Sequence, residues 1–300
     1  MIDSFEIKDI QYELGEESIN LLNEYPNSVN LIDKTGIFTV YKSNVNIIDF
    51  AAKPLSSLLN KNNDIKIQCL ITVTQSHNYF LPGLSSFILN KLNMDKDIYC
   101  IDTNQGCSGF AHALYLASKL LCDFDNIVIL CADKYRSKLC IDDRSTNSVF
   151  SDCSSATLVV KNENGLRIKN KSYSFDGTRV SYLYQSIDDG LNNGFLHMSG
   201  PELWAYTRSQ ILPNIRIMIQ NGNIEYLYLH QASKLVFEGI KSGLNASIKM
   251  PYNYNKYGNT VSSSLPLLIS ENLIYFNKSP SLLAGFGVGL NSMMLELGVE

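Results

Sequence analysis

Three residues with side chains suited to covalent and acid–base chemistry stand where apolar runs give way to loops or helices: Cys107, His230 and Asn259. Cys107 follows the apolar run 98–101 and precedes a segment whose apolar residues recur at helical spacing. The unpaired N–H groups and the positive dipole end of a helix N-terminus favour a thiolate. Glycines on either side let backbone or ligand approach the sulfur. The pattern predicts a nucleophile, with a small core cysteine as the alternative.

The histidine and the asparagine are weaker signals when each is taken alone. His230 follows the apolar run 225–229, and a helical stripe begins shortly after it. Asn259 lies in a Tyr-Gly-Asn-Thr-Val segment that leads into a helix. A lone histidine is more often a structural residue, and a Gly-Asn pair is usually a turn. The glycines of 285–289 lack the strand, loop and helix order of a dinucleotide site.

The elements around these residues read as an α/β protein. The runs 127–132 and 155–160 show no polar alternation, which is typical of strands covered on both faces. The segment 47–60 reads as a helix that Pro54 restricts or kinks, and a further helix is expected around 16–22.

The chain also reads as two similar halves, 1–160 and 161–300. In each half a buried strand is expected to end at a reactive side chain that begins a helix, Cys107 in the first and His230 in the second. This is a predicted repeat of architecture rather than of sequence.

The composition of the chain argues against several classes of protein. The 300 residues are 45% hydrophobic and 18% charged, as in an ordinary globular protein, and the net charge of −4 gives no reason to expect nucleic acid. No apolar run is long enough to span a bilayer, and no basic amphipathic stretch or signal pattern is evident. The seven cysteines form no CxxC pair and no metal-ligand spacing, which favours reduced thiols in the cytoplasm and predicts no metal.

In combination the motifs resemble the β-ketoacyl-[acyl carrier protein] synthase III family. The resemblance runs from about residue 34 to 290, and its segments are Gly-Cys-Ser-Gly-Phe at 106–110, His-Gln-Ala-Ser at 230–233, Tyr-Gly-Asn-Thr-Val-Ser-Ser-Ser at 257–264, Gly-Phe-Gly-Val-Gly-Leu at 285–290, and the flanking stretches 74–82 and 198–200. It implies the thiolase-like αβαβα layered fold, made of two similar halves and usually present as a homodimer.

The resemblance also implies roles for the three residues. Cys107 would take an acyl group from a thioester of coenzyme A or of acyl carrier protein. Malonyl on a carrier protein or on coenzyme A would then lose CO₂, and His230 and Asn259 would donate hydrogen bonds to the enolate. The product would be a 3-oxoacyl thioester, formed without a further cofactor. The oxyanion of each acyl transfer would face backbone N–H groups of Cys107 and of the turn Gly287, Val288 and Gly289.

Other residues are predicted to contact substrate with less support. Lys34 stands where the family often has an arginine, and Leu81 would be the tip of a loop that caps the partner subunit's acyl pocket. Phe286 and Trp204 are assigned to substrate binding, with core packing of the tryptophan as the alternative. Leu235 replaces a basic residue that is common in the family at a position associated with coenzyme A phosphates and carrier-protein docking.

These departures from the family pattern favour an enzyme of a dedicated pathway over one that initiates housekeeping fatty-acid synthesis. Such a pathway would make a polyketide or the acyl group of a surface sugar. The alternative function keeps the acyl-enzyme but transfers the acyl group to an alcohol or amine, forming an ester or amide. A catalytically silent partner subunit is a third reading, which Cys107 argues against.

Overall fold

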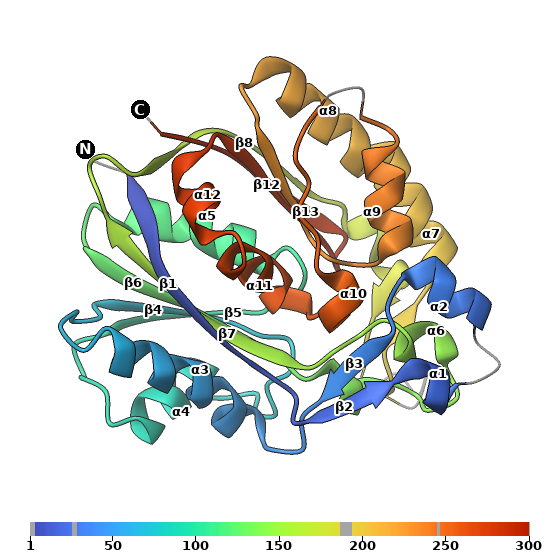
Figure 1. Ribbon diagram of the computed structural model, residues 1–300. Helices are drawn as coiled ribbons and strands as arrows, with labels where there is room; N and C mark the ends of the chain where they lie inside the picture. Colours follow the sequence, from blue (N-terminus) through green and yellow to red (C-terminus); the bar gives the residue numbers. More distant parts are fainter. Residues whose placement is uncertain (1–3, 26–28, 187–193, 245–246, 300) are drawn as a thin grey trace.

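Two groups of strands lie between three layers of helices in the computed structural model, which describes residues 4–25, 29–186, 194–244 and 247–299 (Figure 1). The strands are hydrogen-bonded in the order β11-β12-β13-β8-β1-β7-β6-β4-β5. The first group is β1 (Phe5–Leu14), β7 (Cys153–Lys161), β6 (Asn126–Asp133), β4 (Cys69–Val73) and β5 (Tyr99–Thr103). The second is β8 (Leu166–Phe175), β13 (Asn291–Val299), β12 (Ser281–Gly287) and β11 (Tyr226–Leu229). One residue pair, Phe5 with Leu166, joins the two groups.

The helices occupy the faces that the strand sequences predict. The central layer holds α5 (Gly109–Leu120), α11 (Ser264–Ser270) and α12 (Leu273–Lys278), between the two groups of strands (Figure 1). One outer layer holds α3 (Ile47–Lys61) and α4 (Leu84–Lys91), and the other holds α7 (Gly200–Tyr206), α8 (Leu212–Asn221) and α9 (Lys234–Lys241). This is the αβαβα layering that the family resemblance implies.

Strand β6 shows why the apolar runs have no alternation. Its odd-numbered residues 127–131 pack in the central core, whereas its even-numbered residues 128–132 pack against the outer helices. Because successive side chains of a strand point to opposite faces, a strand covered on both faces needs apolar residues at every position. The sequence prediction for this strand is confirmed.

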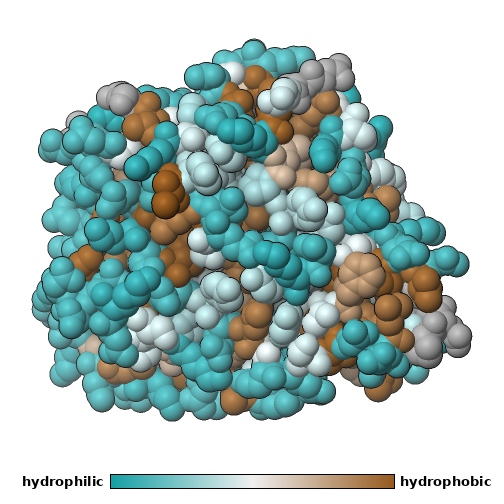
Figure 2. Space-filling model, in the orientation of Figure 1, coloured by the Kyte–Doolittle hydropathy of each residue, from teal (hydrophilic) through white to brown (hydrophobic). Residues whose placement is uncertain are grey.

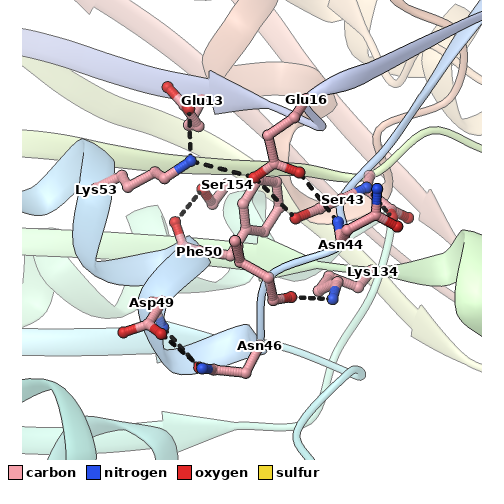
Figure 3. Close-up of polar contacts among 12 residues, drawn as sticks. Glu13, Glu16, Ser43, Asn44, Asn46, Asp49, Phe50, Lys53, Lys134 and Ser154 are labelled. Atoms are coloured by element: carbon pink, nitrogen blue, oxygen red, sulfur yellow. Dashed lines mark hydrogen bonds and ion pairs between the residues drawn. The ribbon is translucent and has the colours of Figure 1, made fainter.

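Helix α3 continues through Pro54, where the sequence predicted a restriction or a kink. A proline cannot donate to the carbonyl four residues earlier, which here is that of Phe50. The hydroxyl of Ser154 donates to this carbonyl at 2.8 Å instead (Figure 3). On the neighbouring turn, Lys53 bridges Glu13 and Glu16 at 3.0 and 3.2 Å. The helix is therefore completed by contacts from strand β7 and from the end of β1.

The helix expected around 16–22 is wrong. Residues Glu17–Asn20 form β2, which pairs antiparallel with β3 (Thr39–Lys42), and only Leu21–Glu24 are helical as α1. Pairing with a distant strand overrides the weak local pattern. Figure 2 shows hydrophobic side chains gathered over α1 and α2 (Val29–Thr35), at the lower right of an otherwise largely hydrophilic face; Leu22 and Val29 are among the exposed apolar residues there.

The predicted repeat is also corrected. The run 98–101 was expected to be a buried strand, but β5 lies at the edge of the sheet beside β4, and Tyr99 is 53% exposed. In both groups the strand pairings run antiparallel, antiparallel, parallel, which makes β11 the counterpart of β4 rather than of β5. Cys107 and His230 therefore do not occupy equivalent places in the two halves.

Shorter elements complete the described chain. They are α6 (Arg144–Asn147), α10 (Tyr254–Tyr257), the strand pair β9 (Leu183–Tyr184) and β10 (His197–Met198), three short 3-10 helices at Tyr135–Lys138, Gly177–Tyr182 and Val261–Ser263, and a π-helical turn at Thr207–Ile211. Within the described ranges, no helix combines the length and apolar character needed to cross a bilayer.

Candidate active site

Cys107 lies in the tight loop between β5 and α5, as the sequence predicts. The helix begins two residues later, and the N–H of Gly109 donates to the carbonyl of Gly106 at 2.8 Å. A side chain at position 106 would come within 2.4 Å of the Gln75 amide oxygen and would displace it from the hydroxyl of Tyr135, from which it accepts at 2.6 Å. The loop is thus packed against its neighbours, and Cys107 itself is 5% exposed.

The environment of Cys107 does not favour a thiolate in the free protein. Burial raises the pKa of its thiol to about 12, and the nearby charge of Asp133 acts in the same direction. The backbone N–H of Cys107 and the side chain of Asn259, in hydrogen-bonding contact with the thiol, oppose this rise. The backbone N–H at the helix start lowers the pKa, in the direction that the sequence predicts, but the cost of burying a charge outweighs this effect. Cys107 rests as a thiol.

His230 stands directly after β11, where its backbone N–H donates to Ala284 at 2.9 Å. Its Nδ1 lies 2.6 Å from the Ser264 hydroxyl, and its ring meets the edge of Phe286 with centroids 5.7 Å apart. Burial lowers the pKa of the imidazole to about 3, so the ring is neutral at physiological pH. When Ser264 donates to Nδ1, the proton sits on Nε2, which becomes a hydrogen-bond donor.

Asn259 is fixed on three sides. Its backbone N–H donates to Val149, and its carbonyl accepts from Ser151, each at 2.9 Å. Its side-chain oxygen accepts from the N–H of Val261 at 2.9 Å, which leaves the amide N–H₂ available on the side of the thiol. The preceding Gly258 has a φ of +69° and would clash with the 149–151 segment if it carried a side chain. The amide therefore keeps a single orientation.

All three residues line one cavity of about 230 Å³. The walls are mainly apolar and come from β9, β10, α7, the π-helical turn, α9 and the turn after β12. They include Leu183, Met198, Leu203, Thr207, Val236 and Leu290. An apolar enclosure excludes water and strengthens hydrogen bonds to a developing negative charge. The cavity thus combines a nucleophile with two neutral donors.

Some of the other residues predicted to contact substrate line the cavity, and others do not. Phe286, Gly287 and Trp204 line the cavity. The Val288–Gly289 turn packs beside it, with a Val288 methyl 3.2 Å from where a side chain on Gly106 would lie. Lys34 is not part of the lining, although the adjacent Thr35 is, and Leu81 is 82% exposed outside the cavity of its own chain.

Asp133 is an important residue that the sequence reasoning missed. It ends β6 fully buried, and it accepts from the N–H of Gln75 at 2.9 Å and from the hydroxyl and N–H of Ser262 at 2.5 and 3.2 Å. Burial raises the pKa of its carboxyl to about 6. The carboxylate ties the loop after β4 to the segment that follows Asn259. A charged residue directly after an uninterrupted apolar strand was the available signal.

Gln231 has a similar connecting role on the other side of the site. Its side-chain oxygen accepts from the N–H groups of Asn253 and Tyr254 at 2.9 and 3.3 Å, and its amide donates to Leu229 at 2.6 Å. The chain after His230 is thereby joined to the segment that leads to Asn259. Among the described residues, no group of three or more His, Cys, Asp or Glu is arranged to hold a metal ion.

Comparison with known proteins agrees with this architecture. The family model described as 3-oxoacyl-[acyl-carrier-protein (ACP)] synthase III matches residues 101–177, and the model of its C-terminal part matches residues 216–297. Together they span more than half of the chain. The chain belongs to the 3-oxoacyl-[acyl-carrier-protein] synthase III family.

Individual relatives of this synthase III family cover most of the chain. A β-ketoacyl-[acyl-carrier-protein] synthase III of Streptococcus agalactiae is 26% identical over 280 residues, covering 86% of each chain. A crystal structure of a 3-oxoacyl-(acyl-carrier-protein) synthase III superposes with a TM-score of 0.87 at 24% identity, over 98% of this chain and 99% of the other. A priming β-ketosynthase of a polyketide pathway gives 0.86 at 19% identity, over 98% and 96%. The two structures share the fold of this chain.

Proposed function

We propose that this chain is a condensing enzyme that forms a 3-oxoacyl thioester. The observation that carries the proposal is the meeting of Cys107, neutral His230 and the oriented amide of Asn259 at one apolar cavity. Membership of the synthase III family supports the same reaction. The acyl donor is proposed to be an acyl thioester of coenzyme A or of a carrier protein, and the second substrate a malonyl thioester.

In the first step the Cys107 sulfur attacks the thioester carbonyl. Because its pKa is raised to about 12, the thiol must lose its proton as the new S–C bond forms. The old thioester bond breaks, and the departing thiolate takes up a proton, so the step is balanced. Backbone N–H groups of Cys107 and Val288 are the proposed donors to the tetrahedral oxyanion.

In the second step the malonyl group loses CO₂, and the bonding electrons form an enolate. The Nε2–H of His230 and the amide N–H of Asn259 are proposed to stabilise its oxygen. The enolate carbon then attacks the acyl group on Cys107 and expels the thiolate, which takes a proton from solvent. A neutral imidazole suits this role, since it donates a hydrogen bond without the cost of a buried cation.

Intact-protein mass spectrometry tests this proposal. The enzyme is mixed with a panel of acyl-coenzyme A and acyl-carrier thioesters, and malonyl-carrier protein is then added while CO₂ is monitored. An adduct on Cys107 that clears with release of CO₂ is the expected result. An adduct that persists with malonyl and clears with an alcohol or amine would instead show ester or amide formation.

We further propose that the enzyme is a homodimer. The outer edge of β5 has no neighbouring strand within the described chain, and the nearby loop exposes Phe80 and Leu81 by 91% and 82%. Exposed edges and apolar tips are normally covered. Sedimentation of Leu81→Asp should show weakened association, whereas Ile274→Asp, at an apolar residue on α12 that is 70% exposed, should behave as wild type.

The cysteines support a reducing compartment, which we propose to be the cytoplasm. All seven are free thiols, and most are partly or fully buried. A protein with this many unpaired thiols is suited to a compartment that keeps them reduced.

A further inference from the structure

Asn291 connects the two segments whose backbone N–H groups are the proposed oxyanion donors, the start of α5 and the 288–290 turn. It begins β13, directly after the 288–290 turn, and it is 6% exposed. Its amide donates to the carbonyl of Val288 at 2.7 Å. Its side-chain oxygen accepts from the hydroxyl of Ser108, the residue that follows the nucleophile. One side chain therefore joins the turn to the start of α5.

The base of the turn is held by the strand pair of Gly287 with Asn291 and by buried Leu290, whose carbonyl accepts from the N–H of Asp176 at 2.8 Å. The Asn291 side chain adds a contact at Val288, the residue of the turn proposed as an oxyanion donor. A side chain on Gly287 would lie 2.6 Å from the Cys107 Cβ and 3.1 Å from its sulfur, so the backbone approaches the nucleophile directly. Gly289 has a φ of +133°, a conformation open to glycine but costly for other residues. Glycines permit this close approach but leave the chain free to adopt other conformations.

Two hydrogen bonds fix the Asn291 side chain, one from the hydroxyl of Ser108 and one to the carbonyl of Val288. The imidazole of His112, one turn further along α5, lies near the same side chain, and burial lowers its pKa to about 4, so no charge at this histidine disturbs the pair at physiological pH.

We propose that Asn291 is a positioning residue for the oxyanion site. It holds the Val288 turn against the N-terminus of α5, so that the N–H groups of Cys107 and Val288 face the same point. This inference rests on the proposed acyl transfer, and it concerns only the steps that pass through a tetrahedral oxyanion. Decarboxylation uses donors on His230 and Asn259, which Asn291 does not contact.

The test compares three reactions of the full-length enzyme. They are single-turnover acylation of Cys107 by an acyl thioester, alkylation of Cys107 by iodoacetamide, and CO₂ release from malonyl-carrier protein. Among the three, only the first passes through a tetrahedral oxyanion, since CO₂ release forms a planar enolate and alkylation forms neither. Asn291→Ala and Asn291→Asp are the variants, and the second keeps an acceptor for Ser108 while removing the donor to Val288. Should Asn291→Ala fail to fold, Asn291→Asp carries the test alone.

Acylation by the variants is expected to slow by at least about tenfold, since loss of one oxyanion donor costs on the order of a hundredfold or more. Alkylation and CO₂ release should stay within about twofold of wild type. Asn277→Ala is the matched control, because Asn277 also makes two side-chain hydrogen bonds, to the backbone of Ile7 at 3.1 and 2.8 Å. It should acylate normally.

Two results would overturn the inference. One is acylation at the wild-type rate in Asn291→Asp, and the other is an equal slowing of acylation and alkylation, which would indicate a general loss of structure. Failure of the wild-type enzyme to acylate from any thioester would overturn the proposed function itself, and the wild-type reaction in the same experiment separates that outcome from the other two.

Discussion

The start of α5 and the start of α11 are counterparts in the two halves of the molecule, and they differ in chemistry. Each helix lies in the central layer and follows an outermost parallel contact, β5 beside β4 in one half and the bridge of Lys249 to Tyr226 in the other (Figure 1). The first helix presents a thiol two residues before it begins. The second is preceded by a short 3-10 helix and presents the amide of Asn259.

The comparison shows that two helix starts of the same architecture supply two different chemical groups. Two helices of related placement direct their preceding loops toward one cavity, where one loop provides the nucleophile and the other a hydrogen-bond donor. His230 reaches the cavity from a third position, directly after β11. The counterpart of β11 in the first half is β4, and Asp133 binds the loop that follows β4. The site therefore depends on contacts between the halves as well as on each half alone.

The largest effect on catalysis is expected from removal of the thiol at the start of α5. Cys107→Ala leaves no sulfur to attack a thioester, so acyl-enzyme formation should fall below detection. Intact-protein mass spectrometry measures the adduct. An adduct of normal yield on this variant would show that another residue is the nucleophile.

Changes to Asn259, before α11, and to His230, after β11, should separate the two steps of the reaction. Asn259→Ala and His230→Ala each remove one proposed enolate donor, so condensation should slow by about a hundredfold or more. Acylation of Cys107 should remain close to wild type, because neither side chain is assigned to that step. CO₂ release and adduct mass give the two rates. Condensation at the wild-type rate would refute the assignment of enolate donors.

A smaller effect is expected where the two halves are joined. In Asp133→Asn, one acceptor oxygen becomes an N–H₂ group that faces a donor of Gln75 or Ser262. We expect the free energy of unfolding to fall by about 2 kcal/mol and condensation to slow several-fold, as measured by urea denaturation and CO₂ release.

The matched control for this variant is Asp9→Asn. Asp9 is a buried carboxylate that binds the N–H of Ile10 and the side chain of Lys61, both at 2.9 Å. This variant should lose stability and keep condensation. Equal catalytic loss in both variants would argue against a special role for Asp133.

The pH dependence of stability tests the burial of His230 without changing the rate of any catalytic step. His230 has its pKa lowered by burial from 6.5 to about 3, so below pH 6.5 the unfolded chain binds a proton that the native state does not. The free energy of unfolding should therefore fall as pH drops from about 6.5 toward 3, by up to about 1.4 kcal/mol per pH unit. Urea denaturation between pH 4 and 7 should show a shallower slope for His230→Gln. His112 contributes equally to the slopes of the wild type and of His230→Gln. Equal slopes for the two proteins would therefore contradict a buried, neutral ring at His230.

The periodicity of the sequence predicted the buried strand β6, the helix after Cys107 and the position of His230, because burial on one or two faces leaves a direct pattern of apolar residues. The motifs, through their resemblance to a family, indicated that Cys107, His230 and Asn259 belong together. The structure brings these residues to one cavity, while their catalytic roles stay predictions.

Other features could not be read from the sequence because they depend on contacts between distant segments. The pKa of Cys107 follows from its burial and from the charge of Asp133, neither of which the local sequence displays. Strand β2 exists because β3 pairs with it. The true counterpart of Cys107 became evident only from the order and direction of the strands.

The proline in α3 has a consequence for how the chain acquires its structure during synthesis. The Phe50 carbonyl that Pro54 leaves unpaired finds its donor in Ser154, 104 residues later. The strand that carries this serine also lies between β1 and β6, which do not touch each other in the sheet order. A nascent chain that ends before residue 153 therefore lacks both the missing helix partner and the strand that joins its first and later segments. We therefore expect the first half to reach its final packing only after nearly all of it has left the ribosome.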